Sequence, residues 1–142
     1  MLKVLFLDVD GVVNCESTIQ RHQGFIGIDP MMAFRVGKIQ LDTDCVFVLS
    51  SDWRHSPDGV EEVEARVGKI FDKTKSMEFP YQVQRGHEIN EWLERHPEVS
   101  KYAILDDNNT MLSHQIPNFF HTTWKDGITD EIMNNVIKHL NG

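Results

Sequence analysis

The sequence predicts a three-layer α/β fold, with helices on both faces of a mostly parallel sheet of five strands. Short apolar runs alternate with segments of helical periodicity, which is the pattern of a parallel sheet with crossover helices. Two helix starts carry a capping residue followed by proline, at Asp29-Pro30 and Ser56-Pro57. Three of the apolar runs end in acidic or hydroxyl side chains. In open α/β sheets, ligands bind beyond those carboxyl ends of the strands.

The first half of the chain is expected to contain three strands and two helices. Residues 2–9 are almost wholly apolar, which is typical of a strand buried on both faces. The polar segment 14–28 predicts a loop or small flap. The first helix is expected to face Met31, Phe34 and Ile39 inward. The remaining elements expected here are a helix from 30 to about 41, a strand at 45–49, a helix from 57 to Gly68 and a short strand at 69–71.

The second half is expected to begin with a loop at 73–84 and to alternate again between helix and strand. The last helix is capped by Thr129, and apolar residues recur along it at helical spacing. The other elements expected here are a helix at 86–96 and strands at 102–105 and 119–122. No linker or repeat interrupts this pattern, so the sequence predicts a single domain over residues 1–142.

Composition and charge exclude several classes of function. No apolar run approaches the roughly 20 residues that span a membrane, and no signal peptide is predicted at the N-terminus. The net charge of −8 disfavours broad, nonspecific binding to nucleic acids. Cys15 and Cys45 form no metal-ligand pattern and are expected to be reduced thiols, which favours a cytoplasmic location. The seven histidines are scattered without paired ligand spacing. Nothing in the sequence indicates an oligomeric state.

The polar residues that end the strands form the candidate site. Because parallel strands deliver their carboxyl ends to one edge, these side chains should meet in one crevice. They are Asp8 and Asp10, Ser50 and Ser51, and Asp106 and Asp107. Such a group of carboxylates repels itself unless a hard cation binds, and Mg²⁺ prefers oxygen ligands. A phosphate would also need cationic partners. The candidate cations are Arg54, Lys69, Lys73, Lys75 and Arg85.

Three motifs resemble those of the haloacid dehalogenase (HAD) superfamily of phosphohydrolases. They are an apolar strand running into Asp-x-Asp-Gly in VLFLDVDGVVN, a strand ending in serine in VFVLSS, and a strand ending in paired acids in YAILDD. The segments LSSDWR, RGHEINEWL and ILDDNN further resemble compact HAD phosphatase modules of nucleic-acid repair proteins. The resemblance implies a Rossmann-like HAD fold with strand order 3-2-1-4-5, a short flap at about 14–28 and no full cap domain.

The resemblance also implies roles for the first motif. Asp8 is the expected nucleophile, which becomes an aspartyl phosphate. Asp10 is expected to protonate the leaving oxygen and then to activate water. The expected ligands of Mg²⁺ are Asp8, the backbone carbonyl of Asp10, and Asp106 or Asp107. The resemblance leaves open which of these last two acids binds the metal directly.

Other roles are assigned to residues outside the first motif. The hydroxyl of Ser50 is expected to bind a phosphoryl oxygen. The superfamily's third motif usually supplies lysine, whereas here Arg85 is expected to neutralise the site, with the lysines as alternatives. Substrate binding is assigned to Gly11, Ser51, Trp53 and Arg54. Gly11 also allows a sharp turn, and the alternatives for Trp53 and Arg54 are packing and ion pairing.

The predicted function is therefore a magnesium-dependent phosphomonoester hydrolase, acting on a phosphorylated nucleic-acid end or a nucleotide. One alternative is a phosphatase of small sugar or metabolite phosphates. Another is a non-catalytic HAD module that binds phosphate or nucleic acid. The intact Asp8, Asp10, Ser50 and Asp106 favour an enzyme, because a binding module needs no nucleophile.

Overall fold

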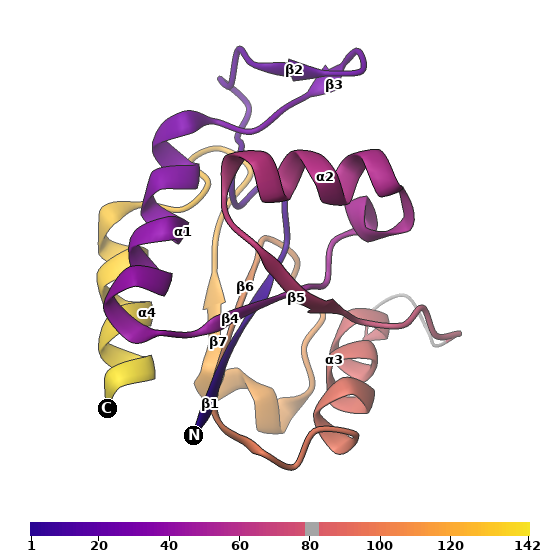
Figure 1. Cartoon of the computed structure of the whole chain (residues 1–142), viewed down its shortest axis with the longest axis vertical. Helices are drawn as coiled ribbons and strands as arrows, with labels where there is room; N and C mark the ends of the chain where they lie inside the picture. The colour runs from indigo at the N-terminus through magenta and orange to yellow at the C-terminus, as the bar shows by residue number, and fades with distance from the viewer. Residues whose placement is uncertain (79–82) are drawn as a thin grey trace.

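The computed structural model describes residues 1–78 and 83–142, and its centre is a five-stranded parallel sheet of order β5-β4-β1-β6-β7 (Figure 1). Counted along the chain, these strands have the order 3-2-1-4-5, so the predicted fold and strand order are confirmed. The strands are β1 (Leu2–Leu7), β4 (Val46–Leu49), β5 (Ile70–Lys73), β6 (Val99–Asp106) and β7 (Phe119–His121). The expected loop at 73–84 includes residues 79–82, which lie outside the described residues.

The helices begin where capping side chains satisfy their first backbone N–H groups. Asp29 accepts hydrogen bonds from the amides of Met31 and Met32, and Ser56 and Thr129 cap the second and last helices. These three predicted caps are confirmed. The helices are α1 (Pro30–Thr43), α2 (Pro57–Arg66), α3 (Gln84–Glu94) and α4 (Asp130–Asn141), with short 3₁₀ turns η1 (Asp52–His55) and η2 (Ser113–Asn118).

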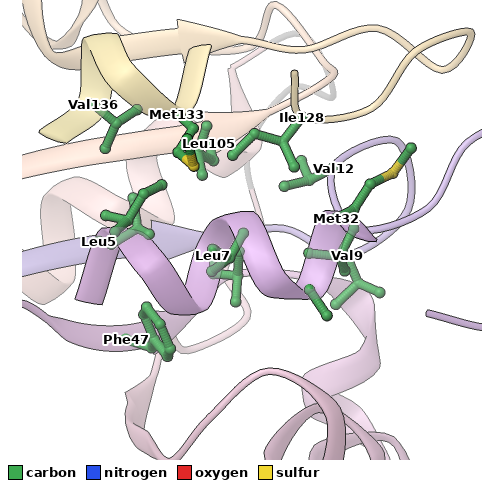
Figure 2. Close-up of a cluster of buried hydrophobic side chains, with 14 of the residues drawn as sticks. Leu5, Leu7, Val9, Val12, Met32, Phe47, Leu105, Ile128, Met133 and Val136 are labelled. Carbon is green, nitrogen blue, oxygen red and sulfur yellow. The ribbon is translucent and has the colours of Figure 1, made fainter. Parts of the chain in front are cut away.

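Two hydrophobic clusters place these helices in layers on the two faces of the sheet. On one face, α1, α2 and α4 cover β1, β4 and β6, as the labelled side chains in Figure 2 show for part of the cluster. On the other face, Ile89 and Trp92 of α3 pack on Val4 and Phe6 of β1. The central strands are thus buried on both sides, which explains their almost continuous apolar sequence.

One prediction about α1 is wrong. Met31 and Phe34 are 58% and 64% exposed, whereas Ile39 is buried as expected. The buried stripe of α1 instead consists of Met32, Ala33, Val36, Ile39 and Thr43. Apolar residues occur on both sides of this helix, so periodicity alone did not identify the side that faces the sheet.

A small antiparallel hairpin, β2 (Arg21–His22) and β3 (Phe25–Ile26), projects beyond α2 at the top of Figure 1. Its turn has positive φ angles of 51° at Gln23 and 84° at Gly24, as tight hairpin turns require. The hairpin is tied to α2 by two contacts. His22 Nδ1 lies 3.7 Å from Glu62 Oε2, and Gln23 Nε2 donates to Asp58 Oδ2 at 3.1 Å.

Cys15 and Cys45 are both free and buried. In the described part of the chain, every helix is too short or too polar to cross a membrane.

Candidate active site

The carboxyl ends of the three central strands bring the predicted site residues together. The parallel pairing places Leu7 beside both Leu49 and Leu105. Hydrogen bonds extend this pairing by one residue, because Asp8 N donates to Leu105 O at 3.1 Å and Ser50 N donates to Leu7 O at 3.0 Å. Asp8, Ser50 and Asp106 therefore lie at one edge of the sheet, as the strand-end argument predicted.

Three carboxylates and one guanidinium form the centre of the site. Asp8, Asp106 and Asp107 each offer an oxygen, and these oxygens all lie within 4.8 Å of one another. Arg85 Nη1 lies 3.0 Å from Asp8 Oδ1 and 2.7 Å from Asp106 Oδ2. Asp8 is 5% exposed and Asp106 is fully buried. Among the cations considered, Arg85 thus occupies the position beside the predicted nucleophile, while Lys73 donates to the backbone carbonyl of Arg54.

Burial and mutual repulsion disfavour the ionised forms of the acids in this cluster. Burial and the negative charge of Asp106 raise the pKa of Asp8 well above its ordinary value, although Arg85 opposes the shift. Burial and Asp106 also raise the pKa of Asp107. Burial would lower the pKa of Arg85, but Asp8 and Asp106 outweigh it and raise that pKa. One arginine does not compensate three neighbouring acids, so the donor set suits a hard divalent cation.

Asp10 lies beside this carboxylate cluster and its side chain is held differently. Its Oδ1 accepts a hydrogen bond from Asn14 Nδ2 at 2.9 Å, and its Oδ2 accepts one from Trp53 Nε1 at 3.2 Å. Asn14 is buried and also donates to Gly27 O at 2.9 Å. Asp10 is exposed, so its carboxyl group is oriented by two neighbours and remains accessible to a ligand.

Gly11 has a packing role that the sequence did not predict. Its φ of +81° favours glycine, and a Cβ at this position would lie 2.2 Å from Asp107 Oδ2. Its N–H donates to Asn14 Oδ1 at 2.9 Å, and its carbonyl accepts from Thr122 Oγ1 at 2.6 Å. Gly11 therefore allows Asp107 to approach the first motif, and its assignment to substrate binding stays a prediction.

The two serines after β4 have different surroundings. Ser51 Oγ accepts from Trp53 N at 3.1 Å and so caps η1. Within the described residues, Ser50 Oγ is buried without a hydrogen-bond partner. A buried hydroxyl without a partner is costly, and its place beside Asp8 fits a group that completes its hydrogen bonding with a ligand oxygen. Ser51, by contrast, is used to shape the chain leading to Trp53.

The assignment of Arg54 to substrate binding is corrected. Its side chain is 3% exposed and pairs with Glu88, itself 4% exposed, at 3.2 Å. Its Nε donates to Thr74 O, and its Nη1 donates to the carbonyls of Ser50 and Ser51. These bonds join the ends of β4 and β5 to α3. The sequence could not separate this role from phosphate binding, because both use a guanidinium beside the second motif.

We expect Arg54→Met to lower the free energy of unfolding by about 3–5 kcal/mol, because it leaves Glu88 buried without its partner. Urea denaturation measures this loss. The double variant Arg54→Met/Glu88→Leu is the matched control and should regain part of the stability. A single variant with unchanged stability and weakened substrate binding would restore the original assignment.

Two cavities adjoin the site residues, a smaller one beside Arg85 and a larger one of about 440 Å³ beside Asp10, between the hairpin and the start of α2. Trp53 lies in the wall of the larger cavity and stacks on His22 of the hairpin, with ring centroids 5.5 Å apart. Sequence patterns predicted a binding role for Trp53 but not for the other aromatic residues of this wall. The lining residues are Asp10, His22, Gln23, Phe25, Ile26, Asp52, Trp53, Ser56, Gly59 and Trp124. They come from segments far apart in the chain, and no spacing relates them.

Comparison with known families decides the class of this domain. Residues 4–133 match the family model described as the HAD domain in Swiss Army Knife RNA repair proteins. The chain belongs to this HAD family. The match includes Asp8, Asp10, Ser50, Arg85 and the paired acids at the end of β6, so the predicted resemblance is confirmed. Comparisons with curated proteins and with solved structures found no match.

The carboxylate cluster of this HAD domain consists of residues that match the sequence motifs of the superfamily. The Asp-x-Asp-Gly motif, the serine after β4 and the paired acids lie at the carboxyl ends of the three central strands of the sheet. Arg85 comes from the first turn of α3, on the opposite face of the sheet from α1. The residues that match the motifs of the HAD superfamily therefore lie together at the carboxyl edge of the sheet.

Proposed function

We propose that this HAD domain is a magnesium-dependent phosphomonoester hydrolase that uses Asp8 as its nucleophile. The observation that carries the proposal is the cluster itself: Asp8 lies in contact with Arg85, and with Asp106 and Asp107 within ligand-sharing distance. A purely structural site would not place three acids where burial raises the pKa values of two of them. A group of buried acids with raised pKa values is typical of a site that binds a cation together with an anionic substrate.

Asp8, Arg85 and Ser50 have separate roles in the proposed phosphoryl transfer. Asp8 attacks phosphorus, and the bond between phosphorus and the leaving oxygen breaks, which leaves an aspartyl phosphate. The guanidinium of Arg85 and the hydroxyl of Ser50 hold the phosphoryl oxygens as their charge changes. Bound Mg²⁺ supplies the positive charge that lets a phosphate approach three carboxylates.

Asp10 handles the proton in both halves of the reaction. In its acid form it gives a proton to the leaving oxygen as the phosphorus–oxygen bond breaks. It then takes a proton from the water that attacks the aspartyl phosphate, which releases phosphate and restores Asp8. Its hydrogen bonds from Asn14 and Trp53 fix the direction of the carboxyl group while leaving it exposed to the larger cavity.

We expect Asp10→Asn to slow phosphoryl transfer from alkyl phosphates about 100-fold or more, and from p-nitrophenyl phosphate far less. A nitrophenolate leaves without a proton, whereas an alkoxide needs one. Single-turnover measurements with both substrates test this expectation, and the variant should accumulate phosphoenzyme with the nitrophenyl ester. Equal losses on the two substrates would remove Asp10 from the role of acid.

For the substrate we propose a phosphorylated nucleic-acid end or a nucleotide. The matched family is named for RNA repair proteins, and aromatic residues line the cavity next to Asp10. The alternative is a small sugar or metabolite phosphate, bound under the hairpin. We also propose a cytoplasmic location, since both cysteines are free.

A direct test of the function is phosphate release with Mg²⁺ from nucleotides, sugar phosphates and oligonucleotides with 3′- or 5′-phosphates. Turnover of at least one of these supports a phosphatase. Binding of phosphate without turnover of any of them would favour the non-catalytic module.

A further inference from the structure

We propose that the larger cavity, which we call the hairpin cavity, binds the nucleobase of the substrate's terminal nucleotide. This inference rests on the proposed phosphatase function and specifies its leaving group. The cavity is the space of about 440 Å³ between the β2–β3 hairpin, η1 and the start of α2. Its volume lies within the range of about 300–1,000 Å³ that is common for small-molecule sites.

The position of Asp10 requires the leaving group to enter this cavity. Asp8 and Arg85 lie 3.0 Å apart at the sheet edge, where the proposed reaction places the phosphoryl group, and a general acid must reach the leaving oxygen directly. Asp10 lines the hairpin cavity, so the leaving oxygen lies between the two sites. The rest of the leaving group, which is attached to this oxygen, therefore extends away from phosphorus into the cavity.

The walls of the cavity suit a flat, aromatic group. His22 and Trp53 already stack, with their ring planes 24° apart. Phe25 is 75% exposed and Trp124 is 41% exposed, although each contributes to the cavity wall. Aromatic rings from the hairpin, η1 and the segment after β7 therefore surround one space. Stacking on such rings is the sequence-tolerant way in which proteins bind nucleobases, whereas a hexose has no aromatic face to offer them.

The charged side chains that line the cavity limit the number of phosphate groups that a ligand can carry there. Asp10 and Asp52 are its charged lining residues among those described, and both are acidic. Asp52 also lines the smaller cavity of about 140 Å³ beside Arg85, so it lies between the phosphate-binding groups and the aromatic wall. Asp52 lies 3.8 Å from Arg85 Nη2, which offsets part of its charge, and together with Asp10 it disfavours a second phosphate in the cavity. The hairpin cavity thus favours a terminal nucleoside joined to one phosphate over a nucleoside polyphosphate.

Contacts with α2 hold the hairpin in the position in which it lines the cavity. His22 contacts Glu62, and Gln23 donates to Asp58, so both anchors lie on α2. At the other end, Glu16 N donates to Trp124 O at 2.9 Å. This hydrogen bond connects the segment before the hairpin to Trp124, and Phe25 and Trp124 both line the cavity, where one ligand could contact both rings.

The first arm of the test compares kcat/KM for adenosine 3′- and 5′-monophosphates with that for acetyl phosphate, which has no ring. We expect the double variant Phe25→Ser/Trp124→Ala to lose about tenfold or more on the better nucleotide, and less than threefold on acetyl phosphate. The control variant Phe34→Ser removes an exposed ring from α1, outside the cavity, and should change neither rate. Equal losses on the two substrates, or a hexose phosphate preferred tenfold over both nucleotides, would overturn the inference.

The second arm needs no phosphatase activity. Equilibrium dialysis of labelled adenosine, which carries no phosphate, should show binding to the wild type and to Phe34→Ser, and little binding to the double variant. If the wild type hydrolyses no phosphomonoester, the proposed function fails, and dialysis alone decides the cavity's role. Adenosine retained by the wild type and lost in the double variant supports the inference. No retention by a folded wild-type protein overturns it.

Discussion

Asp8→Asn is expected to lower kcat by about a thousandfold or more, because an amide is a poor nucleophile and cannot form the aspartyl phosphate. The substitution preserves the shape of a side chain that is only 5% exposed. The measurement is steady-state phosphate release, supported by acid quenching to detect phosphoenzyme in the wild type. Retention of more than about a tenth of the activity would exclude Asp8 as the nucleophile.

The same variant should be at least as stable as the wild type when magnesium is absent. The pKa of Asp8 is raised in the folded protein, above its ordinary value of 3.8. Its ionisation therefore costs stability as pH rises through the raised pKa, and costs nothing below the ordinary value. Thermal midpoints of the two metal-free proteins should agree in strong acid, provided both remain folded, and the variant should gain relative to the wild type towards neutral pH.

A matched control separates loss of chemistry from loss of structure. Asp29→Asn exchanges the same groups at the cap of α1, far from the cluster in the sequence, and asparagine also caps helices well. This control should keep both activity and stability. A fall in the thermal midpoint of Asp8→Asn alone, at neutral pH and without metal, would contradict the charge balance inferred for the cluster.

The sheet and its carboxyl edge could be predicted because the controlling patterns are local. A strand buried on both faces needs an apolar run, and residues 2–9 supply one. Asp8, Ser50 and Asp106 each follow or end such a run, so parallel pairing alone brings them together. The caps at Asp29, Ser56 and Thr129 are local in the same sense, since a single side chain satisfies the nearby amides.

The features that the sequence did not reveal depend on contacts between distant segments. Arg54 is a buried ion-pair partner because Glu88, 34 residues away, faces it across the fold. Gly11 is needed because Asp107 approaches it from β6. The hairpin cavity combines Phe25, Trp53 and Trp124, and neither periodicity nor capping relates these rings. Long-range packing, which no local pattern encodes, decides all three.

Removal of divalent cations is expected to abolish turnover, and Mg²⁺ should restore it better than Ca²⁺. Arg85 Nη1 contacts both Asp8 and Asp106, and this one guanidinium leaves negative charge in the cluster that would repel a phosphate if no divalent cation were bound. Mg²⁺ demands a compact octahedral set of oxygens, whereas Ca²⁺ prefers more ligands at longer distances, which would misalign the attack. The measurement is phosphate release after treatment with EDTA, followed by titration with each cation.

Substitution of the paired acids at the end of β6 tests whether the metal binds at this cluster. Asp106→Asn and Asp107→Asn should each raise the Mg²⁺ concentration needed for half-maximal activity, because each removes a charged oxygen from the group within 4.8 Å. Asp106→Asn should have the larger effect, since Asp106 is fully buried and also holds Arg85 at 2.7 Å. Asp126→Asn, an exposed acid on the segment before α4, is the control and should leave the titration unchanged. Full activity after exhaustive chelation would rule out the mechanism, whereas unchanged titrations for both β6 variants would move the metal away from this cluster.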